Sequence, residues 1–163
     1  MTSKYDKYVI HPPHVRLSMK KDNSVFFDGL MVNHQHLGYD FQFGHQFVTR
    51  PFKGDNPCHS HPFQEFMAWY GSNPDDPDDF QAEIVFCFGE EMEELVFTRP
   101  TIISIPANVH HHPFEIKRVD SPIIQIEIMI GNKEYMPKPT LEKDKDFETN
   151  SMINRETIEY KSK

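Results

Sequence analysis

Between Val25 and Ile130 the sequence is a series of short apolar runs separated by Gly, Asn, Asp and Pro. Thirteen prolines in 163 residues leave little room for long helices, and fourteen phenylalanines favour strands and packed interiors. We therefore predict an all-β chain. The expected strands cover residues 25–33, 39–49, 58–61, 65–70, 82–89, 93–98, 101–106, 110–118 and 122–130.

Alternation within two of these segments predicts which side chains share a face. In segment 41–47 the odd positions hold three phenylalanines and His45, whereas the even positions hold Gln, Gly and Gln. Side chains two residues apart on a strand point to the same face, so we expect His45 to face inward among aromatic rings. In segment 122–130 the even positions from 124 onward are all Ile, and the odd positions include Gln125 and Glu127. For these two residues an interior cavity and the solvent remain equal alternatives.

The chain is predicted to contain one domain with two flanking segments. Residues 1–24 are polar and are expected to form an extended arm, with an edge strand or a swapped segment as alternatives. Residues 25–136 form the domain itself, and the acidic, proline-broken stretch 72–79 within it is expected to be a solvated loop. The charged and mixed residues 137–163 are predicted to be a surface tail or a short helix.

Composition excludes several classes of partner. The formal net charge is −8 and there is no basic cluster, so we expect no nucleic-acid ligand. The first residues contain no apolar signal region, and no run of 18 apolar residues occurs, so we expect no membrane partner and a cytoplasmic location. The two cysteines, Cys58 and Cys87, are too few for a disulfide framework and are expected to be buried thiols.

Five of the ten histidines lie in two short segments, 58–65 and 109–113. His59 and His61 are two residues apart and so present their imidazoles to one face of a strand, and Glu65 has the same parity. A third imidazole from a distant strand would complete a set of three nitrogens and one carboxylate oxygen. Such a set suits one divalent Fe, Mn, Ni, Co, Cu or Zn ion and is a poor match for Ca²⁺ or Mg²⁺.

Both histidine-rich segments resemble the conserved motifs of the cupin superfamily. Residues 54–65, followed by Gly71, are similar to the first motif, in which a glycine precedes an HxH pair, a glutamate and a second glycine. Residues 105–111, with the sequence IPANVHH, are similar to the second motif, a PxGxxH turn that delivers the last histidine ligand. Asn108 stands where the family has Gly, and Asn tolerates the left-handed backbone of such a turn.

This resemblance covers about residues 25–131 and implies a single-domain cupin, a double-stranded β-helix (jelly-roll) barrel with the N-terminal arm and the charged C-terminal tail attached. Counting from the proline of the second motif, His111 matches the last metal ligand. His110 and His112 have the opposite parity and are expected to face away. The implied ligands of the metal ion are His59, His61, Glu65 and His111.

Cupins carry out many reactions, so the resemblance leaves more than one function open. We favour a metalloenzyme that acts on a small organic substrate in the barrel cavity, an aromatic or keto acid, by dioxygenase-type oxidation or by Lewis-acid isomerase or lyase chemistry. The candidate catalytic residues are Glu65 and His45. The alternative is a non-catalytic cupin that binds or senses a small molecule or a metal.

Two further expectations follow from the sequence. His34 and His36 form a second HxH pair with no glutamate at a matching offset, so we expect them at the surface. The resemblance also implies a homodimer, for which the N-terminal arm and the isoleucine stripe 124–130 offer surfaces.

Overall fold

The computed structural model describes residues 3–20, 22–54, 57–131, 138–139 and 153–158. These residues form thirteen strands, one short helix, α1 (His34–Leu37), and a 3-10 turn at Asp6–Tyr8. The strands are β1 (His14–Met19), β2 (Val25–Val32), β3 (Phe41–Val48), β4 (Phe52–Lys53), β5 (His59–Ser60), β6 (Gln64–Gly71), β7 (Ala82–Phe88), β8 (Glu93–Phe97), β9 (Thr101–Ile105), β10 (His111–Val119), β11 (Ile123–Ile130), β12 (Lys138–Pro139) and β13 (Ile153–Ile158).

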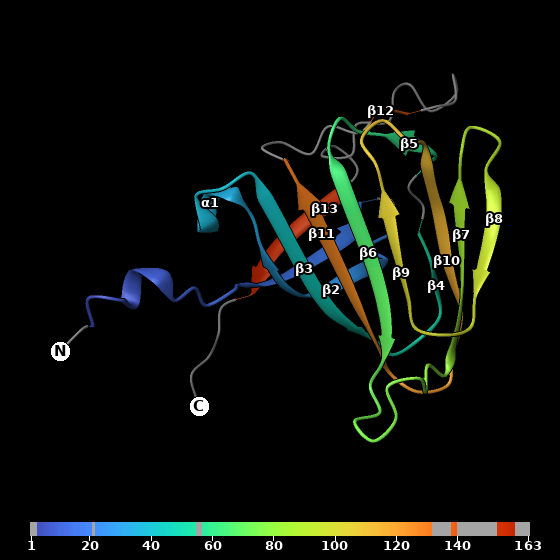
Figure 1. Ribbon diagram of the computed structural model, residues 1–163, viewed down its shortest axis with the longest axis horizontal. Coiled ribbons are helices and arrows are strands. Elements are labelled where there is room, and N and C mark those ends of the chain that lie inside the picture. The colour runs from blue at the N-terminus through green and yellow to red at the C-terminus, as the bar shows by residue number, and fades with distance from the viewer. Residues whose placement is uncertain (1–2, 21, 55–56, 132–137, 140–152, 159–163) are drawn as a thin grey trace.

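The strands form two antiparallel sheets (Figure 1). The large sheet has seven strands in the order β13-β1-β2-β3-β11-β6-β9. The small sheet has the order β12-β5-β10-β7-β8, with β4 paired to β10. Neighbours in the large sheet are mostly distant in sequence, as where β11 lies between β3 and β6. The predicted all-β jelly-roll class is confirmed, and each of the nine predicted strands is present with its ends within two residues of the prediction.

The hydrophobic core lies between the two sheets. Trp69 and Ile105 of the large sheet and Phe86 and Ile116 of the small sheet are all fully buried. The indole ring of Trp69 meets the ring of Phe86 edge to face, with centroids 6.2 Å apart. Because one face of each sheet packs on this core, alternate residues of each strand face inward.

The ends of the chain extend the large sheet beyond the predicted domain. β1 lies within the predicted arm and is hydrogen-bonded to β2 on one side and to β13 on the other. The prediction of a surface tail or short helix is therefore wrong for residues 153–158, which form β13. Without β13, the backbone donors and acceptors on that edge of β1 would lack strand partners. The predicted domain end near residue 136 and most of the tail lie outside the described residues.

The face of β3 that points inward is the opposite of the one predicted. Gln46 is 5% exposed, whereas Phe47 is 55% exposed. The amide of Gln46 accepts a hydrogen bond from the backbone N–H of Asp28 (2.9 Å) and donates one to the carbonyl of Phe26 (3.2 Å). The Gln46 side chain thereby supplies hydrogen bonds to the backbone of β2 where β2 diverges from β3 and the two strands no longer pair. Because its amide is satisfied in this way, a polar residue can face inward here. His45 lies on the outer face, against the ring of Phe47.

No helix among the described residues is long and apolar enough to cross a membrane.

Candidate metal centre

The structure brings the four predicted ligand residues together at one end of the space between the sheets. His59 lies in β5 and His61 directly follows that strand, whereas Glu65 lies in β6. His111 is the first residue of β10 and is paired with His59 across the two strands. All four residues are at most 2% exposed. Strands distant in sequence therefore bring three imidazoles and one carboxylate together in a buried cluster.

The three imidazoles are oriented by the backbone in the same way. Each places its Nδ1 atom against the carbonyl oxygen of a residue two positions away. The pairs are His59 with Pro57 (2.8 Å), His61 with Phe63 (3.0 Å) and His111 with Val109 (2.9 Å). A carbonyl oxygen can only accept, so each Nδ1 carries the proton and donates it. Each Nε2 is then the atom available to a metal ion, the usual arrangement for a metal-binding histidine.

The Nε2 atoms lie around the carboxylate of Glu65. Oε2 of Glu65 is 2.8 Å from Nε2 of His61 and 3.3 Å from Nε2 of His111. One ligand nitrogen from each of His59, His61 and His111 can be chosen so that all lie within 4.8 Å of one another. Nε2 of His111 is buried and makes no hydrogen bond. A cation at this position would satisfy that nitrogen, so the donor set fits a metal ion.

The close approach of His61 to Glu65 also requires a positive charge. Because Nδ1 of His61 donates to a carbonyl, its Nε2 would otherwise present a lone pair to a carboxylate oxygen 2.8 Å away. Two acceptors are held at this distance only by a proton or a metal ion between them. A proton on Nε2 of His61 or a metal ion between the two groups would supply that charge.

The protonation states at this centre favour metal binding. Burial opposes ionisation of Glu65, but contacts with the imidazoles of His111 and His61 outweigh it and lower the pKa of Glu65 to about 2. Burial, followed by the charge of His111, lowers the pKa of His59 to about 4. At pH 7 Glu65 is therefore ionised and His59 neutral, which are the forms that bind transition metals.

The turn before β10 positions His111. Asn108 adopts the left-handed conformation expected of it, with φ of 65°, and its N–H donates to the carbonyl of His61 (2.7 Å). This hydrogen bond joins the second motif to the first, so His61 and His111 are held at a fixed distance from each other.

Strand alternation predicted that His110 and His112 both face away from the centre, and this prediction is correct for His110 and wrong for His112. His110 is half-buried and its Nδ1 lies 3.6 Å from a carboxylate oxygen of Glu90, away from the centre. His112 is 5% exposed, and its ring stacks on that of His59 with centroids 4.9 Å apart. The backbone of His112 is left-handed (φ of 73°), and the pairing of β10 with β7 shifts register between His111 and Phe114. This irregularity breaks the two-residue period, so parity fails at that point.

The two residues left open by the sequence both face the interior. Gln125 is 5% exposed, and Glu127 lies opposite the buried Met67 in the pairing of β11 with β6. Burial, and next the nearby charge of Glu65, raise the pKa of Glu127 to about 8, although a hydrogen bond from Gln42 (3.1 Å) opposes this. Glu127 therefore carries a proton at neutral pH. It is a second acidic group on the face that holds Glu65.

Other residues considered from the sequence lie elsewhere. His45 is on the outer face of the large sheet, opposite to the centre. His34 and His36 belong to α1, where the Nδ1 atom of His36 contacts its capping residue, and neither is buried. Cys58 and Cys87 are buried thiols, as predicted, and form no disulfide with each other. Gln42 was not among the predicted site residues.

Comparison with known proteins found similarity at the level of structure alone. The sequence matches no protein-family model and no curated protein. A cupin protein from Bacteroides fragilis is 12% identical with a TM-score of 0.45, over 72% of this chain and 88% of that one. An oxalate oxidase bound to the substrate analogue glycolate is 11% identical with a TM-score of 0.45, over 84% of this chain and 61% of that one. Oxalate decarboxylase from Bacillus subtilis is 11% identical with a TM-score of 0.43, and this chain spans about a quarter of its length (68% of this chain and 26% of that one).

The strand order and the positions of the histidines in it can be compared directly with the two sequence motifs. Two antiparallel sheets enclose one core, paired histidines lie at β5, and a third histidine opens β10 directly opposite the first. These are the positions that the two sequence motifs require. The chain therefore has the jelly-roll fold that the motifs predicted, with a group of three histidines that could hold a metal ion.

Proposed function

We propose that this chain binds one divalent transition-metal ion through the Nε2 atoms of His59, His61 and His111 and the carboxylate of Glu65. The observation that carries the proposal is the shared orientation of the three imidazoles. Each donates Nδ1–H to a backbone carbonyl and so keeps Nε2 available, and Nε2 of His61 and of His111 lie 2.8 Å and 3.3 Å from the buried carboxylate of Glu65. The donor set suits Fe, Mn, Ni, Co, Cu or Zn rather than Ca²⁺ or Mg²⁺.

We further propose that the chain is an enzyme acting on a small organic acid or carbonyl compound. The bound metal would supply Lewis-acid polarisation of a substrate oxygen or, with a redox-active ion, oxidation by dioxygen. Glu127 would hold the proton that such chemistry needs, because burial raises the pKa of its carboxyl group and it lies on the face that holds Glu65. Gln42 orients the carboxyl group of Glu127 through its hydrogen bond. Glu127 thus replaces His45, on the outer face, as the acid–base candidate.

Metal binding is tested by comparing His61→Ala with His110→Ala after each protein is reconstituted with Mn²⁺, Fe²⁺, Ni²⁺ or Zn²⁺. Elemental analysis and titration should give one ion per wild-type chain. His61→Ala removes a ligand and should weaken binding by more than about 100-fold. His110→Ala is the matched control and should bind as the wild type does. If the two variants behave alike, or if the wild type holds no stoichiometric metal, the ligand assignment is wrong.

Turnover is tested separately with the reconstituted protein. Oxygen uptake and substrate loss would be followed against a panel of keto acids, dicarboxylic acids and phenols. Turnover that is lost in Glu127→Gln while metal content is unchanged would support the proposed proton donor. Stoichiometric metal and saturable ligand binding without turnover would favour the alternative, a non-catalytic binding cupin.

A further inference from the structure

A groove outside the metal centre lies between the hairpin of β1 and β2 and the segment that joins β3 to β4. It opens where residues 25–28 of β2 diverge from β3, since the two strands pair only from Gly29 onward. Two adjoining hollows make up the groove, and they share Val25, Phe26 and Phe52 as lining residues. No ligand of the proposed metal centre lines either hollow.

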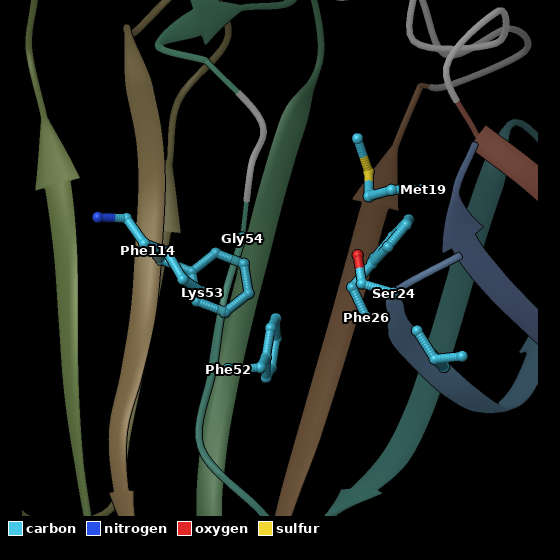
Figure 2. Close-up of a pocket in the computed structure, with 8 residues that line it drawn as sticks. Met19, Ser24, Phe26, Phe52, Lys53, Gly54 and Phe114 are labelled. Atoms are coloured by element: carbon cyan, nitrogen blue, oxygen red, sulfur yellow. The ribbon is translucent and has the colours of Figure 1, made fainter. Parts of the chain in front are cut away.

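The inner hollow is aromatic and has a volume of about 150 Å³. Figure 2 shows the rings of Phe52 and Phe114 on one side of it and Phe26 and Met19 on the other. The Phe52 and Phe114 rings meet edge to face, with centroids 5.4 Å apart. An apolar cavity of about 150 Å³ is large enough to hold a benzene ring. The hollow is therefore matched to one aromatic ring.

Gly54 keeps this hollow open. A Cβ atom at Gly54 would lie 3.3 Å from the carbonyl oxygen of Phe114 and 3.4 Å from its ring. Phe114 would then have to shift by a few tenths of an ångström, and its ring forms one wall of the hollow. The glycine that opens the first sequence motif therefore also sets the shape of this groove.

The outer hollow is polar and has a volume of about 450 Å³. The one acidic residue that lines it, Asp28, is hydrogen-bonded by Arg16 (3.0 Å) and also contacts His14. Although burial opposes ionisation, these two bonds keep the pKa of Asp28 below its usual value. Arg50 also lines the hollow and makes no ion pair with any described residue. One guanidinium is thus left to bind an anion.

The neighbouring cation does not contribute. Lys53 follows Phe52 on β4, so its side chain has the opposite parity. In Figure 2 its ammonium group points away from the hollow, and it lies 3.9 Å from a carboxylate oxygen of Glu115. The cationic end of the groove is therefore Arg50.

We propose that this groove is a second ligand site that binds a small aromatic carboxylate of about the size of benzoate. The ring lies among Phe26, Phe52 and Phe114, and the carboxylate binds the guanidinium of Arg50. The complementary positive charge is significant because the whole chain carries a net charge of −8 and would otherwise repel an anion. This site is independent of the proposed metal chemistry.

Benzoate, benzyl alcohol and acetate are the probes that test the site, used with the full chain and followed by amide chemical shifts in NMR. Benzoate should perturb residues 24–26 and 52–54 and bind about tenfold more tightly than benzyl alcohol, because one charge-assisted hydrogen-bonded pair has about that effect. Acetate, which has no ring, should bind more weakly than benzoate. Equal affinities for all three probes would overturn the proposal.

Three variants separate the parts of the site. Arg50→Gln should weaken benzoate binding about tenfold and leave benzyl alcohol binding unchanged, whereas the exposed Arg99→Gln is the matched control and should change neither. Ser24→Phe fills the hollow from its exposed rim and should abolish binding of both ligands, whereas Gly54→Ala presses on the wall formed by Phe114 and should weaken binding of both. Two variants of the hollow are used so that misfolding of one, visible in its amide spectrum, does not decide the result.

The metal centre provides the counter-test. His61→Ala should leave benzoate binding in the groove unchanged, because that residue does not line it. Benzoate binding that is lost in His61→Ala and retained in Ser24→Phe would place the ligand at the metal centre and would disprove the groove site.

Discussion

The histidines of the proposed metal centre are oriented by main-chain atoms rather than by acidic side chains. The accepting carbonyls belong to residues two positions away from each imidazole, so the local strand and turn geometry fixes the tautomer. A substitution at Pro57, Phe63 or Val109 removes a side chain but leaves the carbonyl in place. The orientation of the imidazoles therefore depends on the backbone path.

Glu127 should make stability depend on pH in a distinctive way. Its pKa is raised from 4.5 to about 8, so between these values the folded chain holds a proton that the unfolded chain has lost. In this window the free energy of unfolding of the metal-free protein should fall by about 1.4 kcal/mol per pH unit on account of Glu127 alone. Glu127→Gln should lack this loss, so its stability relative to the wild type should increase from pH 4.5 to pH 8.

Urea unfolding of both proteins at a series of pH values measures the effect. Gln42→Met supplies a second check, because it removes the hydrogen bond that opposes the raised pKa and should extend the window to higher pH. Parallel stability curves for the wild type and Glu127→Gln would show that the carboxyl group of Glu127 is not perturbed.

At the scale of elements, the chain path at the end of β6 requires a glycine, Gly71, which is the second glycine of the first sequence motif. Gly71 lies where β6 leads into the acidic loop, and a Cβ atom there would overlap the carbonyl oxygen of Asp79. The loop returns close to the strand, so only a residue without a side chain fits. The acidic loop is solvated, as predicted, yet its last residue packs against the sheet.

Gly71→Ala should therefore destabilise the fold by about 2–3 kcal/mol, because the atoms that must move belong to the backbone. Gly38→Ala is the matched control: Gly38 ends α1 with φ of 72°, but a Cβ atom there would meet nothing within 4 Å. It should cost only about 1 kcal/mol, the strain of a left-handed alanine. Denaturant midpoints distinguish the two, and equal losses would contradict the steric explanation.

At the scale of the whole molecule, the outer face of the large sheet is apolar. Leu30, His45, Ile126, Ala68 and Ile102 follow one another across five adjacent strands in one row. Leu30 and Ile102 are 38% and 60% exposed. Phe47 and Ile130 on the same face are 55% and 48% exposed. Exposed apolar side chains grouped on one sheet face are typical of surfaces that bind another protein, and a second copy of the chain is the occupant we propose.

Replacing Phe47 and Ile102 together by Lys should convert a dimer into a monomer without loss of the fold. Both side chains are more than half exposed, so their removal leaves the core intact. Light scattering after size-exclusion chromatography gives the mass. Val96→Lys, on the equally exposed outer side of β8 in the small sheet, is the control and should remain dimeric. A wild-type protein that is monomeric would rule out this interface.

Much of the fold was predictable because strand signals are local. Short alternating runs bounded by Gly, Pro, Asn and Asp gave the nine strands, and two-residue spacing placed His59 and His61 side by side. Residues 153–158 were assigned to a tail or helix because polar and apolar residues alternate only weakly there. They form a strand because the edge of β1 offers unpaired backbone groups to which they bind. His112 was misplaced because a single left-handed residue breaks the two-residue period.

The sequence by itself determined the all-β fold and which residues belong to the proposed metal centre, because periodicity, turn chemistry and motif spacing are written along the chain. Tertiary structure alone decided which face of each strand is buried. Alternation defines two faces of β3 and β11 without stating which one packs on the core, and hydrophobicity suggested the wrong face for His45. The long-range pairing of β3, β11 and β6 places Gln42 and Glu127 inside and leaves the isoleucines outside, so the second acidic group near the imidazoles is a property of the assembled sheet.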